Sequence, residues 1–254
     1  AFGIGMSEGK LRDEPLLKLI PEPIFVAKQS ANISVKTRPW DYRDKQYWRQ
    51  FGVTKKILRK FDVLPINYYW INEERFSCNS VSYRYRFDCG YKIYRPLEKD
   101  FKWSSNVDSQ CLQGYNQLPK TGGEIFLTSS LKDVMCLEVL GYASFALQSE
   151  MLMPKAKTIE EIKGRFEKVT VFYDNDYNNS NNPGQTMAKK ICRKFNIKNV
   201  CIPSSYKSKD ISDLVKNYSL KEAQNVIKNM ERTSQEGLKD KVEADRSGRD
   251  QIPF

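Results

Sequence analysis

The sequence predicts a mixed α/β protein whose C-terminal half contains a parallel sheet flanked by helices. Residues 119–215 alternate short apolar strands with amphipathic helices, which is the order typical of a parallel sheet. Residues 37–118 combine helical patterns with short alternating strands and favour an α+β subdomain. The chain has 254 residues, of which 40% are hydrophobic and 29% charged, so it can bury the core of one large or two small domains.

We expect four parts along the chain. Residues 1–36 are rich in Gly and Pro and indicate an N-terminal arm or linker. Residues 37–118 form a basic and aromatic section, and residues 119–215 form the α/β section. Residues 216–254 are predicted to be helical to about Met230 and to continue as a charged tail.

The composition excludes several kinds of chemistry. The chain contains no histidine, so imidazole bases, imidazole metal ligands and histidine proton shuttles are absent. Its six cysteines include no Cys-x-x-Cys pair, which argues against a zinc ribbon. No stretch reaches the ~18 apolar residues of a membrane helix. Metal or acid–base chemistry must therefore come from carboxylates, amines, guanidinium groups, phenols or the backbone.

Positive charge and aromatic rings gather in the same part of the chain. The net charge is +11, and residues 36–120 hold 17 of the 42 Lys and Arg but only 9 of the 31 Asp and Glu. They also hold 18 of the 31 aromatic residues. Cations and rings in alternation suit single-stranded nucleic acid, whose phosphates and bases they contact. The alternative is that the rings form the core of an antiparallel sheet.

Two helical patterns open this basic section, at residues 44–51 and 55–61, and short strands follow. Residues 83–87 read Tyr-Arg-Tyr-Arg-Phe, which predicts a strand with one aromatic and one basic face. Both interpretations of the rings can then hold, one for each face.

In the α/β section, a first apolar strand at residues 124–128 runs into Ser129 and Ser130, which open a helix that ends at Gly141. Small hydroxyl residues at such a turn offer helix caps and free N–H groups to an anion. An ordinary N-cap has the same pattern, so this segment alone does not decide between the two.

A second strand, residues 168–173, leads directly into Asp174-Asn175-Asp176. Side chains at positions i and i+2 of a strand lie on one side, and ligands bind at the carboxyl edge of a parallel sheet. Two adjacent carboxylates repel unless a cation neutralises them, and oxygen ligands favour Mg²⁺ or Mn²⁺. The alternative is a polar turn rich in Asp and Asn.

A third short strand, residues 199–203, precedes Lys209 and Asp210. A carboxylate after a neighbouring strand would complete a cluster of metal ligands with the two aspartates above. The alternative is that Asp210 caps the helix that follows it.

Together these segments resemble a Toprim domain, whose signature is a strand ending in Glu-Gly, a later Asp-x-Asp and then a Lys-Asp. Here the Asp-x-Asp is Asp174-Asn175-Asp176, with Gly184 opening the next helix, and the Lys-Asp is Lys209-Asp210.

The basic section resembles the RNA-polymerase half of phage primases, which are related to bacterial primase and to phage primase–helicases. The resemblance covers residues 38–230, and the order of the motifs is more specific than any one motif. The segments that carry it are residues 47–53 (YWRQFGV), 91–96 (YKIYRP), 101–106 (FKWSSN), 113–115 (QGY) and 118–119 (LP).

The resemblance implies a Toprim-type, Rossmann-like sheet and the activity of a phage-type DNA primase core. Such a core is a DNA-directed RNA polymerase, a nucleotidyltransferase that makes short RNA primers on single-stranded DNA from NTPs. Its Toprim carboxylates would hold Mg²⁺ or Mn²⁺ beside the triphosphate and the attacking 3′-hydroxyl. The residues carried over as metal ligands are Asp174, Asp176 and Asp210, and those expected at nucleotide or template are Lys92, Arg95, Lys102, Lys132, Ser129, Ser130 and Lys209.

One departure from the family puts catalysis in question. The family's Glu-Gly is replaced by Ser129-Ser130, and a neutral serine cannot supply the missing carboxylate charge. We expect Glu150, after the strand of residues 143–148, to reach the same edge and act with Asp174 and Asp176 as a catalytic residue. A separation of more than about 10 Å from Asp174 would exclude this, because even a water-mediated contact fails at that range. Otherwise the site binds metal weakly and catalysis is reduced or lost.

The chain also lacks the zinc-binding module of the family and a helicase P-loop, Gly-x-x-x-x-Gly-Lys-Ser/Thr. The resemblance therefore implies a polymerising core. Either the zinc-binding and helicase modules lie on the same full-length chain outside this sequence, or a separate zinc-binding module and a replicative helicase act with it as partners. The N-terminal residues have no apolar run of a secretory signal, so we expect a cytoplasmic protein, in the host cytoplasm if it is phage-encoded, with no membrane partner.

Three functions stay open at this point. An active primase requires divalent metal and loses RNA synthesis in Asp174→Asn. A catalytically impaired replisome module binds single-stranded nucleic acid without divalent ions and tolerates that substitution. A Toprim nuclease or topoisomerase-like enzyme would use one of the 14 tyrosines for strand passage, but the motifs of residues 47–118 favour the primase.

Overall fold

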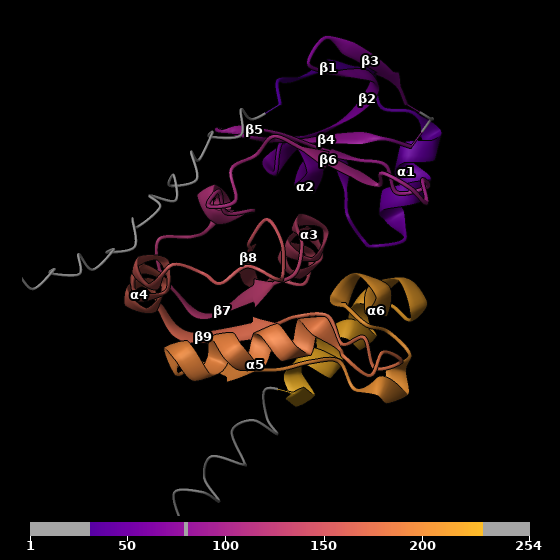
Figure 1. Cartoon of the computed structure of the whole chain (residues 1–254). Helices are drawn as coiled ribbons and strands as arrows, with labels where there is room; N and C mark the ends of the chain where they lie inside the picture. The colour runs from indigo at the N-terminus through magenta and orange to yellow at the C-terminus, as the bar shows by residue number, and fades with distance from the viewer. Residues whose placement is uncertain (1–30, 79–80, 231–254) are drawn as a thin grey trace, which may run out of the picture. The chain divides into compact units, whose positions relative to one another are not determined.

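The computed structural model describes residues 31–78 and 81–230 and arranges them as two β-sheets with associated helices (Figure 1). The mixed α/β class predicted from the sequence is confirmed, including a parallel sheet flanked by helices. The expectations for the N-terminal arm up to residue 30 and for the charged tail after residue 230 lie outside the described residues.

The first sheet is antiparallel and has the strand order β1-β2-β4-β5-β6. Strand β3 pairs with residues 68–71 of β2, whereas β4 pairs with residues 63–65 of that strand. The sheet is built from residues 33–105 and is therefore the sheet of the basic section. Its strands are β1 (Ile33–Thr37), β2 (Val63–Ile71), β3 (Glu74–Ser77), β4 (Tyr83–Phe87), β5 (Gly90–Tyr94) and β6 (Trp103–Ser105). Strand β1 includes residues that the sequence pattern assigned to the arm, and the four-part division of the chain stays a prediction.

Two short helices, α1 (Tyr42–Arg49) and α2 (Lys55–Lys60), lie close to the helical patterns expected from the sequence. Side chains that accept backbone N–H groups start both of them. Asp41 accepts from the N–H groups of Arg43 and Asp44, and Thr54 accepts from that of Ile57. These caps satisfy donors that have no partner within a helix.

The strand expected at residues 83–87 is β4, but its basic face is only partly exposed, because Arg86 is exposed and Arg84 is not. Tyr83 and Tyr85 are fully buried, as an aromatic core requires, but Arg84 is also buried and pairs with Asp62 at 3.0 Å. The reason is that β4 lies between β2 and β5, and a second apolar cluster containing Ile66 covers the sheet on this side.

The second sheet is parallel and has the order β10-β9-β7-β8. Its strands are β7 (Gly122–Thr128), β8 (Ala143–Ala146), β9 (Phe166–Phe172) and β10 (Lys198–Asn199). In-register pairs such as Thr128 with Phe172 and Thr128 with Ala146 bring the carboxyl ends of β7, β8 and β9 to one edge.

Helices cover both faces of this sheet, because its strands alternate apolar side chains between them. One face packs on α4 (Ala156–Arg165) and α5 (Pro183–Phe195), and α5 runs along β9 (Figure 1). The other face packs on α3 (Leu131–Val139), α6 (Ile211–Asn217) and a helix of residues 220–230. No helix of the described residues is long and apolar enough to cross a membrane.

Helix α3 also packs against the basic section. Its residues Leu131 and Val134 share one apolar cluster with Trp48, Phe61 and Tyr85. The Cys136 thiol lies 3.7 Å from the backbone oxygen of Phe51, and Lys60 pairs with Glu138 at 2.5 Å. These contacts fix α3 against α1, α2 and the turn that joins them.

Candidate functional site

Polar residues collect where the parallel strands end. Ser129 and Ser130 follow β7, Glu150 follows β8 and Asp174 follows β9. Lys209 and Asp210 close the loop after β10, and the backbone N–H of Asn175 donates to the carbonyl of Lys209 at 2.7 Å. This is the edge at which open parallel sheets bind ligands.

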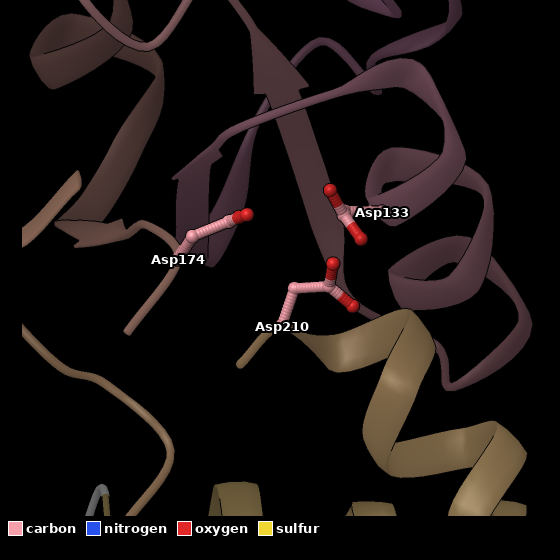
Figure 2. Close-up of side chains that lie close together, drawn as sticks. All are labelled: Asp133, Asp174 and Asp210. Carbon is pink, nitrogen blue, oxygen red and sulfur yellow. The ribbon is translucent and has the colours of Figure 1, made fainter. Parts of the chain in front are cut away.

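Three carboxylates meet at this edge. One oxygen from each of Asp133, Asp174 and Asp210 lies within 4.8 Å of the other two. The three side chains point toward one another from the first turn of α3, the end of β9 and the start of α6 (Figure 2). All three are buried, and Asp133 is only 2% exposed.

Helix caps hold two of these carboxylates. Ser130 caps α3, and its hydroxyl donates to Asp133 Oδ2 at 2.6 Å. Asp210 caps α6, where its Oδ1 accepts from the Asp213 N–H and from the Ser212 hydroxyl, both at 2.6 Å. The cap predicted for Asp210 is therefore confirmed, and its side chain also belongs to the cluster, while its role as a metal ligand stays a prediction.

The Asp174 backbone is held from three sides. Its N–H donates to Ser129 Oγ at 3.1 Å, and its carbonyl accepts from Gln185 Nε2 at 3.1 Å. The neighbouring Asn175 donates through Nδ2 to the carbonyl of Ile202 at 2.8 Å. The position of the carboxylate is thus set before any ligand arrives.

Burial and mutual repulsion raise the pKa values of this cluster. Burial, together with the charges of Asp210 and Asp174, raises the pKa of Asp133 to about 8. Burial and the charge of Asp210 also raise the pKa of Asp174. Raised pKa values mean that ionising these carboxyl groups together costs free energy, and a bound cation would offset that cost.

Two lysines supply part of that offset. Lys209 Nζ lies 2.6 Å from Asp174 Oδ2 and 3.8 Å from Asp210 Oδ2. Burial by itself would lower the pKa of Lys209, but Asp174 raises it above its usual value. Lys132 likewise has its pKa raised against burial by Asp210 and Asp133.

The donor set fits Mg²⁺ or Mn²⁺. Carboxylate oxygens from three separate elements converge, and hard oxygen ligands are those that these ions prefer. Oδ1 of Asp133 is buried and has no hydrogen-bond partner among the described residues. Because an unpaired buried carboxylate oxygen is costly, a bound cation is the partner that its position favours.

Asp176 does not join this cluster, in contrast to the ligand set expected from the sequence. Strand β9 ends at Phe172, so the period-two alternation stops before the Asp-x-Asp segment. The Asp176 N–H instead donates to Asn182 Oδ1 at 3.1 Å within the following turn. Asp176 lines a neighbouring polar pocket of about 420 Å³ together with Lys207 and Lys209, and a role for it stays a prediction.

The member that sequence reasoning missed is Asp133. Acidic residues are common three positions after a serine N-cap, because they stabilise the start of the helix. The sequence pattern around Asp133 therefore gave no reason to expect a second role. The available signal was its position one turn after a strand whose carboxyl end meets the same edge as Asp174.

Of the basic residues expected to contact nucleotide or template, Lys102 and Lys92 lie near the carboxyl edge of the parallel sheet, and Arg95 does not. Partial burial and the positive charges of Lys132 and Lys209 lower the pKa of Lys102, while Asp210 acts to raise it. Lys92 donates to the carbonyl of Gln148 at 3.1 Å, and burial lowers its pKa to about 8.

Arg95 points elsewhere. Its guanidinium donates to the carbonyl of Phe101 and lies 5.5 Å from the ring centre of Tyr69, within the antiparallel sheet. A nucleotide contact by Arg95 therefore stays a prediction that its present hydrogen bond does not favour.

Solved structures show which known fold this is. A DnaG primase catalytic domain bound to single-stranded DNA is 12% identical, with a TM-score of 0.54 over 74% of this chain and 74% of that one. The zinc-binding and RNA-polymerase domains of Aquifex aeolicus primase are 15% identical, with a TM-score of 0.52 over 80% of this chain and 61% of that one. The E. coli primase catalytic core is 14% identical, with a TM-score of 0.51 over 74% of this chain and 72% of that one.

The fold is therefore that of a primase-type catalytic core. No protein-family model matches the sequence, and no curated protein matches it significantly. The likeness is thus one of fold, and function has to be argued from this chain's own residues.

Proposed function

We propose that the chain is the catalytic core of a phage-type DNA primase, which synthesises short RNA primers on single-stranded DNA by metal-dependent nucleotidyl transfer. One observation carries the proposal. A buried group of three aspartates lies at the ligand-binding edge of a primase-type fold, beside lysines that face the same charges. Polyphosphate, divalent cation and this arrangement of charge suit one another.

Asp133, Asp174 and Asp210 would hold Mg²⁺ or Mn²⁺. When bound, the ion neutralises the triphosphate and favours the ionised form of the attacking 3′-hydroxyl. The caps at Ser130 and Asp210 fix the carboxylates, so the site needs little reorganisation during the reaction.

The lysines act on the phosphates. Lys209 and Lys132 stay protonated because neighbouring carboxylates raise their pKa values, so each presents a full positive charge at the edge. Lys102 shares this field. Such fixed charges orient a triphosphate and stabilise the charge that develops on its oxygens.

The template side of the proposal rests on β6 and the two residues before it. Phe101 is 80% exposed and Trp103 is 38% exposed, with Lys102 between them. Lys92 Nζ lies 4.9 Å from the ring centre of Trp103. Exposed rings and cations in alternation suit stacked bases and phosphates of single-stranded DNA.

The remaining parts of a priming system would come from elsewhere. We propose a replicative helicase and a zinc-binding module as partners, and the cytoplasm as the place of action, in the host if the chain is phage-encoded. Support comes from the Aquifex aeolicus primase structure, which contains a zinc-binding domain beside its RNA-polymerase domain.

The test is RNA synthesis from labelled NTPs on single-stranded DNA with Mg²⁺ or Mn²⁺. We expect wild type to form short RNA and Asp174→Asn and Asp210→Asn each to lose at least ~100-fold in rate, because each removes a charge at the centre of the cluster. Glu167→Gln is the matched control, since Glu167 is exposed on β9 at the end of the strand far from Asp174.

The same assay separates the alternative, a catalytically impaired module that binds single-stranded nucleic acid. Replacement of the family's Glu-Gly by Ser129-Ser130 is the observation that favours it. Salt-sensitive DNA binding in EDTA, together with no RNA from wild type at any divalent metal concentration, would favour that module over the primase.

A further inference from the structure

Building on the proposed function, we propose that Glu150 is a further catalytic-site residue whose carboxylate binds a second divalent cation between itself and Asp174. The inference starts from the end of β8, whose last residue is Ala146, and from the turn that follows it. Glu150 lies in this turn, and its carboxylate is not part of the group formed by the three aspartates, whose oxygens lie within 4.8 Å of one another.

The contacts around Gly184 bring the Glu150 carboxylate close to the backbone of Asp174. A methyl group built on Gly184 would lie 3.1 Å from Glu150 Oε2 and 2.6 Å from the Asp174 carbonyl oxygen. Gly184 is in α5 and has no left-handed backbone conformation, so its φ does not require glycine. The lack of a side chain at Gly184 is instead what allows the Glu150 carboxylate to reach the backbone of Asp174.

Ser129 acts on both carboxylates. Its Oγ accepts the N–H of Asp174 at 3.1 Å, and hydrogen bonding by its side chain acts to lower the pKa of both Glu150 and Asp174 against the burial that raises them. A serine has one O–H proton and can donate to only one of them at a time. The other carboxylate then lacks a donor at this position.

Two buried polar atoms lack a hydrogen-bond partner, which supports a ligand near Glu150. Glu150 Oε2 is buried and has no hydrogen-bond partner among the described residues, and the same is true of the Tyr173 hydroxyl. Tyr173 is 1% exposed, and the charge of Glu150 adds to the burial that raises its pKa. Asp133 Oδ1, at the other side of the cluster, is likewise buried and unpaired.

A cation between Glu150 and Asp174 would give the unpaired Glu150 Oε2 a partner. Burial, Asp174 and Asp176 all act against the ionised form of Glu150 and raise its pKa, so a positive charge here offsets repulsion from several directions. With a first ion at Asp133, Asp174 and Asp210, Asp174 would be shared by two ions, as in two-metal sites for phosphoryl transfer.

The same placement explains why a serine can stand at position 129. Ser129, which replaces the acidic residue of the resembled signature, bonds the Asp174 backbone and acts on the pKa of Glu150. In this proposal the missing negative charge is supplied by Glu150, in the turn after β8, instead of by a residue after β7.

The experiment compares Glu150→Gln with wild type, Asp174→Asn and the control Glu167→Gln. Mn²⁺ binding is counted by electron paramagnetic resonance, and RNA synthesis is measured on single-stranded DNA. We expect wild type to bind two Mn²⁺ and Glu150→Gln to bind one, with synthesis reduced at least ~10-fold. Glu150→Asp, which keeps the charge, should keep the second ion with weaker affinity.

A relocation variant tests the geometry. Adding Ser129→Glu to Glu150→Gln returns a carboxylate to the end of β7 and should restore the second Mn²⁺ and most of the lost synthesis. Circular dichroism and melting curves check that each variant folds, and Glu150→Ala takes the place of Glu150→Gln if the latter does not fold.

The outcomes for the two proposals differ. If Glu150→Gln binds two Mn²⁺ and keeps full activity while Asp174→Asn is inactive, the role of Glu150 is refuted and the primase proposal stands. If wild type makes no RNA but loses one Mn²⁺ on Glu150→Gln, the second cation stands and the primase proposal fails.

Discussion

Lys209 donates a 2.6 Å hydrogen bond to Asp174, which places one ammonium group among three buried carboxylates. The lysine and the aspartate come from different loops, after β10 and β9, and the Asn175 N–H to Lys209 carbonyl bond of 2.7 Å joins those loops. The pair therefore links the stability of the metal-free protein to the affinity of its proposed metal site.

Removal of this ammonium should separate those two properties. We expect Lys209→Met to lower the melting temperature in EDTA, because the carboxylates lose their nearest cation. Saturating Mg²⁺, which at a hundred times its Kd stabilises a folded protein by about 2.7 kcal/mol, should recover most of the loss. Melting curves with and without Mg²⁺ measure both effects. Lys190→Met, on the exposed surface of α5, is the control, and equal melting of the two variants in EDTA would contradict the expectation.

The stability of the metal-free protein should depend on the ionisation of Asp133. Its pKa is about 8 in the folded protein against 3.8 in the unfolded chain. The neutral carboxyl group therefore contributes to the free energy of unfolding in full below pH 4, and this contribution is lost as the pH rises to about 8. Asp133→Asn cannot ionise and should gain on wild type between pH 5 and pH 8, by on the order of 1–3 kcal/mol. Urea denaturation in EDTA at the two pH values measures this, and a difference that stays constant with pH would exclude it.

Gly184 should not accept a side chain. The methyl group of Gly184→Ala would lie 2.6 Å from the Asp174 carbonyl oxygen, so either α5 or the Asp174 loop must move. We expect a loss of about 1–3 kcal/mol in the free energy of unfolding and weaker Mg²⁺ binding. The control is Gly164→Ala in α4, where no atom lies within 4 Å of the new methyl group and a gain of about 0.5–1 kcal/mol is expected. Equal effects of the two substitutions would show that Gly184 has no special contact.

Lys102 should contribute to DNA binding mainly through charge. In Lys102→Ala, we expect the slope of log K against log salt concentration for single-stranded DNA to fall by about 1, with little dependence on sequence. Fluorescence anisotropy at several salt concentrations gives the slope. Lys190→Ala, on α5, serves as the control, and an unchanged slope in Lys102→Ala would place the DNA elsewhere.

Much of the fold could be predicted from the sequence because the central strands carry a clear pattern. Strands β7 and β9 are short apolar runs that lead directly into polar turns, and the helices before and after β9, α4 and α5, have one apolar face. The burial of Arg84 could not be predicted in this way, because it depends on which strands flank β4 and on the carboxylate of Asp62.

The candidate site was visible in part. Asp174 and Asp210 follow strands and can be placed at one edge from topology alone, whereas Asp133 is placed there by the packing of α3. Asp176 was expected beside Asp174 because strand alternation was extended past the end of β9, where the chain turns instead. The position of Glu150 depends on a loop after β8 and on the small size of Gly184, which only the three-dimensional structure combines.

The most direct test of the central claim is the location of Mn²⁺ by anomalous X-ray scattering from crystals grown with the ion. The account predicts a peak at about 2 Å from carboxylate oxygens of Asp133, Asp174 and Asp210. An ordered protein with fully occupied Mn²⁺ elsewhere and none at these three aspartates would contradict it.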